Sequence, residues 1–147
     1  MQKTLDYYNR NARKFAEGTA GVDFTGIQNR FLSYLPERAL ILDFGCGSGR
    51  DTVALEEQGY LVTAMDGAKR MCELAEIYTD RDVLHLTFEE MDFDEVFDGI
   101  WACASLLQLE METDESWYNC FYHHLRAEMD EYYRAKRCLR VVTSGFL

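Results

Sequence analysis

The sequence predicts an α/β fold in which a parallel sheet of about five strands carries helices on both faces. Two observations indicate this fold. From residue 39 onward, short apolar runs alternate with segments of helical periodicity. The apolar runs are continuous, which is typical of strands buried on both faces of a parallel sheet. The chain has 147 residues, of which 48% are hydrophobic, so one domain with a sizeable core is expected.

Two helices are expected before the first strand. Apolar residues recur at helical spacing over residues 3–17, and Gly18 and Gly21 are expected to end this helix. The same spacing continues to Leu35, just before Pro36, and Asp23 is the expected N-cap of this second helix.

Strands and helices then alternate along the chain. Strands are predicted over residues 39–44, 60–65, 83–87, 97–104 and 138–143, and helices over residues 50–58, 68–78 and 113–136. The acidic run EEMDFDE, between the third and fourth strands, predicts a solvated loop or a single helical turn.

Charge and composition exclude several classes of function. The chain has 26 acidic and 15 basic residues and a net charge of -11, so it should repel the phosphates of nucleic acids. No apolar run reaches the length of about 18 residues that a membrane span needs, and the start of the chain does not read as a secretory signal, so we expect a cytoplasmic protein. The five cysteines show no C-x-x-C spacing, which argues against a disulfide framework and a metal site.

The stretch LILDFGCGSGRD, residues 40–51, places Gly45, Gly47 and Gly49 directly after a predicted buried strand. Ligands of parallel α/β sheets bind beyond the carboxyl ends of the strands. Glycine lets the backbone turn sharply and approach such a ligand closely. Three glycines at alternate positions therefore favour a bound ligand over a plain strand-to-helix turn.

Two aspartates flank this glycine loop. Asp66 ends the second strand, where a carboxylate can accept both hydroxyls of a ribose; the alternative is a loop or helix-capping aspartate. Asp43 lies at the end of the first strand, where a carboxylate is rarely left unpaired. It could accept N–H groups of the loop or receive a cationic ligand. The dinucleotide fingerprint G-x-G-x-x-G is incomplete, because Arg50 stands where its third glycine would fall.

The segments ILDFGCGSGRDTVALEEQGYLVTAMDGAKRMCELA and FDGIWACASLL resemble the glycine-rich motif, the acidic second motif and the fourth strand of class I S-adenosylmethionine-dependent methyltransferases. GSGRD, MDGAKRM and FDGIWACASLL, with YYNRNARKFAEGT near the start, are similar to a branch that includes tellurite-resistance methyltransferases. The resemblance covers about residues 7–109. It implies a Rossmann-like fold, S-adenosylmethionine as cofactor, and methyl transfer to a small-molecule acceptor by direct displacement.

The resemblance also implies roles for single residues. Asp66 would bind the ribose hydroxyls, and Asp43 would orient the loop and the amino group of the cofactor. The residues under its methionine and ribose part would be Gly45, Cys46, Gly47 and Gly49. Those around the adenine would be Gly67, Phe88 and Glu89. Those that line or close the site would be Cys103, Ala104, Ser105, Tyr7 and Phe15. No catalytic side chain is expected, because the sulfonium already activates the methyl group and the protein need only align the reactants.

The family pattern is lost after Leu109, and too few residues follow to complete a seven-stranded sheet. We therefore expect a single domain with an N-terminal helical lid (1–37), a cofactor-binding core (38–109) and a divergent C-terminal helix and strand (110–147). The chain could be a natural short variant, a fragment, or the product of a deletion or shifted reading frame. An exposed sheet edge favours pairing with a strand of another chain, so we expect a homodimer that forms through this edge or through the C-terminal helix.

Two other functions stay open at this point. The chain could be a degenerate family member that serves as an interaction module, because the expected helix 113–136 is rich in aromatic residues. It could also be a nicotinamide-dependent oxidoreductase. The missing third glycine and the lack of a second catalytic domain make this last function the weakest of the three.

Overall fold

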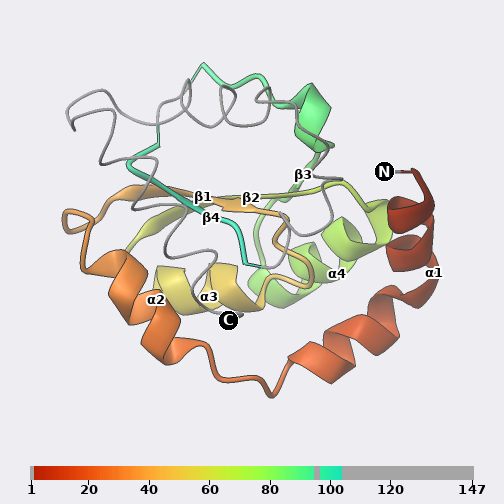
Figure 1. Ribbon diagram of the computed structural model, residues 1–147, viewed down its shortest axis with the longest axis horizontal. Helices are drawn as coiled ribbons and strands as arrows, with labels where there is room; N and C mark the ends of the chain where they lie inside the picture. The colour runs from red at the N-terminus through yellow and green to blue at the C-terminus, as the bar shows by residue number, and fades with distance from the viewer. Residues whose placement is uncertain (1, 95–96, 104–147) are drawn as a thin grey trace, which may run out of the picture.

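The computed structural model describes residues 2–94 and 97–103, and within them four parallel strands form one sheet (Figure 1). The strands are β1 (Leu40–Phe44), β2 (Leu61–Asp66), β3 (Leu84–His85) and β4 (Gly99–Trp101). They lie in the order β3-β2-β1-β4. Residue 41 pairs with residue 62 of β2 on one side and with residue 99 of β4 on the other. The predicted α/β fold with a parallel sheet is confirmed.

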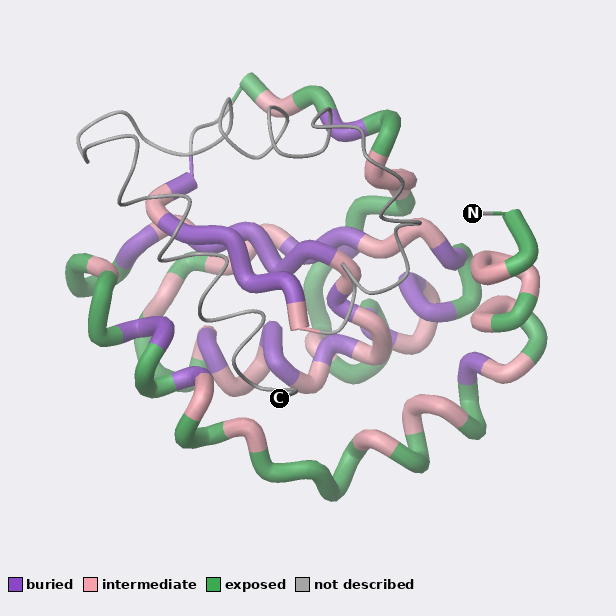
Figure 2. The backbone as a smooth tube through the Cα atoms, viewed as in Figure 1, coloured by how far each residue is buried: buried purple, intermediate pink, exposed green. Residues whose placement is uncertain are grey.

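Strand β1 is buried on both faces, as its continuous apolar run predicts (Figure 2). Leu42 and Phe44 face one side of the sheet, where they pack with Phe97 and Ile100. Ile41 faces the other side and belongs to a second cluster formed with α2 and α3. Because successive side chains of a strand point to opposite faces, both layers of the core need apolar residues from the same short strand.

The α-helices are α1 (Gln2–Thr19), α2 (Thr25–Leu32), α3 (Arg50–Glu57) and α4 (Lys69–Thr79), and η1 (Phe88–Glu90) is one turn of 3₁₀ helix. Helices α2, α3 and α4 lie on the same side of the sheet (Figure 1). Met91, Phe93 and Phe97 cover the opposite side. The expected helix 113–136 and strand 138–143 lie outside the described residues. In the described part of the chain, no helix is long and apolar enough to cross a membrane.

Several predicted boundaries need correction. Gly18 does not end the first helix: α1 continues to Thr19, whose hydroxyl donates to the carbonyl of Phe15 at 3.0 Å. Asp23 is not the N-cap residue of α2, although its Oδ1 accepts the N–H of Thr25 at 2.9 Å. Strands β3 and β4 are shorter than predicted. The sequence predicts a loop or a single helical turn for the acidic run: its first two residues end η1, and residues 91–94 follow without regular structure.

Helix α1 packs on α4. Its apolar stripe, which includes Leu5, Tyr8 and Phe15, surrounds a buried cluster that contains Met71 of α4. The side-chain oxygen of Asn9 also accepts the backbone N–H of Arg70 at 3.1 Å. The N-terminal helix is thereby held beside the carboxyl ends of the strands, where a ligand of this fold would bind.

Gly49 is required by both conformation and packing at the start of α3. Its φ is +85°, and a Cβ there would lie 2.6 Å from Cγ2 of Thr79 and 3.3 Å from Cβ of Ala75. We expect Gly49→Ala to lower the free energy of unfolding by roughly 2–4 kcal/mol, measured by urea denaturation. The matched control is Gly59→Ala, because Gly59 has φ +92° but open space around it. Equal losses in both variants would contradict the packing argument.

Candidate functional site

A cavity of about 550 Å³ lies beyond the carboxyl ends of the strands. This volume falls within the roughly 300–1,000 Å³ of small-molecule sites. The glycine loop after β1 and Cys103 after β4 both line it, so it lies where the strand order reverses between β1 and β4. Helix α1 and residues 19–24 supply further lining, much of it aromatic or aliphatic. The end of β2, α4 and the residues at 87–88 also contribute, so segments from most of the described chain wall the cavity.

The glycine loop is fastened to the end of β2. Gly45 and Gly47 have φ values of +75° and +58°, which glycine adopts without strain. The N–H groups of Gly45 and Cys46 both donate to the carbonyl of Met65 at 2.9 Å. The N–H of Gly47 donates to Oδ2 of Asp66, also at 2.9 Å. These bonds set the loop close to the carboxylate that ends β2.

Asp66 lies in the cavity wall with both carboxylate oxygens oriented by backbone groups. Oδ2 accepts the N–H of Gly47, and Oδ1 accepts the N–H of Ala68 at 2.8 Å. Burial raises the pKa of Asp66, and the two N–H bonds only partly offset this effect. Each oxygen has lone pairs for further donors. The side chain is therefore placed to accept hydroxyl groups of a ligand in the cavity.

Asp43 does not accept the N–H groups of the glycine loop, which was one of its two expected roles. It is 2% exposed, lies beneath the loop, and accepts the hydroxyl of Thr52 at 2.5 Å. Burial raises the pKa of Asp43 to about 7. Asp66 accepts the N–H of Gly47 instead, because Asp43 pairs with Ala64, two positions deeper in the sheet than Asp66, and points to the face covered by α3.

The structure brings most of the predicted cofactor-binding residues to this cavity. Those that line it are Gly45, Cys46, Gly47, Asp66, Gly67, Phe88 and Cys103, together with Phe15. Those outside its lining are Asp43, Gly49 and the exposed residues Glu89 and Tyr7. Ala104 and Ser105 lie outside the described residues.

Tyr8, rather than Tyr7, faces the cavity from α1. Tyr7 is 58% exposed, whereas Tyr8 lines the cavity and packs edge-on against Phe15, with ring centroids 5.0 Å apart. The helical stripe that contains Leu5, Tyr8, Ala12 and Phe15 is the sequence signal that selects Tyr8.

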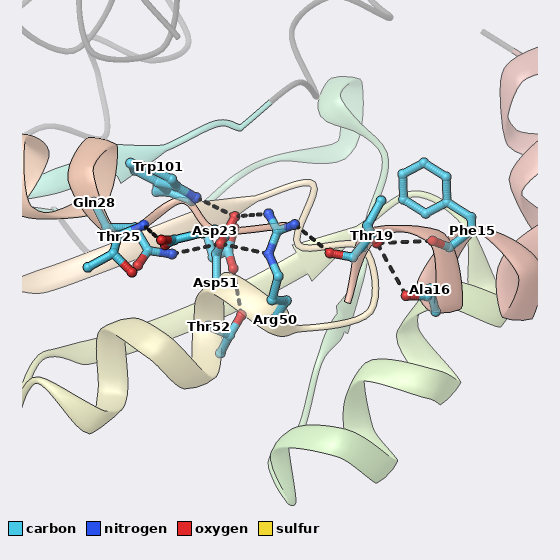
Figure 3. Close-up of polar contacts among 12 residues, drawn as sticks. Phe15, Ala16, Thr19, Asp23, Thr25, Gln28, Arg50, Asp51, Thr52 and Trp101 are labelled. Atoms are coloured by element: carbon cyan, nitrogen blue, oxygen red, sulfur yellow. Dashed lines mark hydrogen bonds and ion pairs between the residues drawn. The ribbon is translucent and has the colours of Figure 1, made fainter. Parts of the chain in front are cut away.

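Sequence reasoning missed a polar network centred on Asp51, which is 6% exposed (Figure 3). Its Oδ1 accepts Nε2 of Gln28 at 2.8 Å and Nε of Arg50 at 3.1 Å. Its Oδ2 accepts Nη2 of Arg50 and Nε1 of Trp101, both at 3.0 Å. The network joins α2, α3 and β4. No local pattern signals it, because Gln28 and Trp101 lie far from Asp51 in the sequence.

The two thiols in the cavity wall are poor nucleophiles. Burial raises the pKa of Cys103 to about 11 and that of Cys46 well above its ordinary value. Both are therefore protonated at neutral pH, and the thiolate is the reactive form. Among the described residues, no group of three or more histidine, cysteine or acidic side chains could hold a metal ion.

Curated proteins similar to this chain are methyltransferases. The ubiquinone biosynthesis O-methyltransferase of Rickettsia typhi is 40% identical over 73 residues, which cover 46% of this chain and 29% of that protein. The cypemycin N-terminal methyltransferase of a Streptomyces species is 33% identical over 78 residues, covering 51% and 32%. The chain spans about a third of the length of the curated relatives it matches.

Solved structures share the fold. A TehB-like S-adenosylmethionine-dependent methyltransferase from Corynebacterium glutamicum superposes with a TM-score of 0.58 at 22% identity, covering 92% of this chain and 68% of that one. Magnesium protoporphyrin IX methyltransferase from Synechocystis, solved with bound S-adenosylmethionine, has a TM-score of 0.67 at 15% identity, covering 84% and 71%.

The family model described as "Methyltransferase domain" matches residues 41–128, which is more than half of the chain. The matched region begins in β1 and includes the glycine loop, Asp66 and β4. The chain belongs to the methyltransferase domain family.

Proposed function

We propose that this chain binds S-adenosylmethionine in the cavity and transfers its methyl group to a small-molecule acceptor. The observation that carries the proposal is the pairing of the glycine loop with Asp66, joined by the bond from the Gly47 N–H. A carboxylate fixed by two backbone N–H groups at the end of β2 suits a ribose with two adjacent hydroxyls. Family membership and the shared fold support the same cofactor.

The lining residues divide the cavity between the parts of the cofactor. Asp66 would hold the ribose, with Gly67 and Phe88 beside the adenine. The main chain of Gly45–Gly47 would lie under the methionine. The ring of Phe88 stacks on Phe44 at a centroid distance of 4.1 Å, which gives the adenine end a fixed aromatic wall. The remaining space, toward Cys103 and residues 19–24, would receive the acceptor.

When bound, S-adenosylmethionine supplies an electrophilic methyl group on a sulfonium sulfur, which the acceptor takes by direct displacement. The chain would align the two reactants and keep water out, and such alignment alone lowers barriers substantially. Tyr8 and Phe15 present aromatic rings to the cavity from α1. Aromatic faces attract cations, so these rings would favour the sulfonium.

Calorimetry with S-adenosylhomocysteine tests the proposal. Wild-type protein should bind this product, and NADH should not compete for the site. Absence of detectable binding at millimolar ligand would refute the cofactor proposal, and competition by NADH would instead favour an oxidoreductase.

The homodimer stays a prediction: light scattering at micromolar protein should give twice the 17.1 kDa mass of the chain.

A further inference from the structure

Arg50, the first residue of α3, contacts residues 19–24, which border the acceptor end of the cavity, and its bond to Thr19 is drawn in Figure 3. Its Nη1 donates to the carbonyl of Thr19 at 3.0 Å, where α1 ends. Its guanidinium carbon lies 4.2 Å from the centroid of the Phe24 ring. Burial raises the pKa of Cys103, which follows β4, and the charge of Arg50 partly offsets this effect. One side chain thus joins the start of α3 to two points of the segment between α1 and α2.

The guanidinium itself is held in a fixed plane. Nε and Nη2 donate to the two oxygens of Asp51 as a fork, at 3.1 and 3.0 Å. The same carboxylate is fixed by Gln28 and Trp101, so it cannot rotate to follow the arginine. Only a planar guanidinium can bind both carboxylate oxygens, stack on a ring and still reach Thr19. Lysine has the charge but not this geometry.

The carbonyl of Thr19 is also the acceptor of the Val22 N–H, at 3.2 Å, so it anchors the turn between α1 and α2. Thr19, Val22 and Phe24 all line the cavity. The charge of Arg50 is matched by Asp51, and most of its N–H groups are used on protein atoms. The geometry of Arg50 therefore suits it to hold residues 19–24, which form one wall of the cavity, and leaves it less suited to bind a charged acceptor.

We propose that Arg50 is a positioning residue, which fixes residues 19–24 as the wall of the acceptor end through Thr19 and Phe24. The consequence for the ligand rests on the proposed function. With the wall fixed, the bound cofactor is retained and the acceptor end keeps one shape. When the guanidinium is lost, the wall opens more often, while α3 and β4 stay folded because Asp51 keeps its bonds from Gln28 and Trp101.

Hydrogen exchange and ligand kinetics test this role in the full chain with Arg50→Lys. A charge-assisted hydrogen bond is worth about a tenfold change in an opening equilibrium. We expect amides of residues 19–24 to exchange about tenfold faster, and S-adenosylhomocysteine to dissociate about tenfold faster. Peptides covering 50–57 and 99–103 should be unchanged. Arg70→Lys is the matched control, since among residues 2–94 and 97–103 the side chain of Arg70 pairs with Glu73 at the surface.

A second variant, Phe24→Leu, keeps the ion pair and removes the ring beneath it; it should give a smaller acceleration in the same segment. Unchanged exchange of residues 19–24 in Arg50→Lys would overturn the proposal. So would equal acceleration in all three peptides, which indicates a general loss of stability. If the wild type binds no S-adenosylhomocysteine, the proposed function fails, and the exchange of residues 19–24 still decides the role of Arg50.

Discussion

Replacing Asp66 with alanine is expected to weaken the binding of S-adenosylhomocysteine by about 100-fold or more. On the proposed function, the substitution removes the acceptor of two ribose hydroxyls, and hydrogen bonds to a charged group contribute roughly 1.5–3 kcal/mol each. It also removes the partner of the Gly47 N–H, so the glycine loop keeps only the bonds of Gly45 and Cys46 to the carbonyl of Met65. Isothermal titration calorimetry of the two proteins gives the difference directly.

The variant should still fold. Burial raises the pKa of Asp66 despite its hydrogen bonds, so the ionised carboxylate is not a net source of stability at neutral pH. Circular dichroism and thermal unfolding check this point. Asp82→Ala removes an exposed aspartate and should bind like the wild type. An affinity of folded Asp66→Ala within a few-fold of the wild type would contradict the assigned role.

Asp43 should make the stability of the protein depend on pH between about 4 and 7. Burial raises its pKa in the folded state from 3.8 to about 7, so in this range the folded protein binds more protons than the unfolded chain. The contribution of Asp43 to stability is therefore complete below about pH 4 and is lost as the pH rises through about 7. With about 1.4 kcal/mol for each pKa unit, the loss is at most about 4 kcal/mol.

Asp43→Asn removes the titrating group and keeps an oxygen for the Thr52 hydroxyl. The difference in free energy of unfolding between the wild type and this variant, measured by urea denaturation, should change in favour of the variant between pH 4 and pH 7. It should be constant on either side of that range. A difference that is independent of pH throughout would show that Asp43 is not buried as a protonatable group. Asp82→Asn serves as the control, since an exposed aspartate should leave this profile unaltered.

The fold and the centre of the site follow from local patterns. The run ahead of Gly45 is continuous because β1 is covered on both faces, and this burial is visible in its composition. The glycines mark the turn after it because positive φ values are costly for other residues. Asp66 ends the next strand, and parallel strands bring their carboxyl ends together at one edge. These features depend on a residue's own conformation or on neighbours a few positions away.

The tertiary structure alone decided which side chains meet across distant segments. In the folded chain the N–H of Gly47 donates to Asp66, whereas Asp43 accepts the hydroxyl of Thr52. The sequence of one strand does not show how far its residues lie from the sheet edge relative to those of the neighbouring strand. The tertiary structure showed that Gly49 packs against Ala75 and Thr79 of α4. It also placed Arg50 where its guanidinium binds both Thr19 at the end of α1 and Asp51 of α3. The sequence by itself determined the sheet, the glycine loop and the carboxylate beside it. Only the tertiary structure decided the position of residues 19–24, because their contacts with Arg50 join residues that are distant in the sequence and share no periodic pattern.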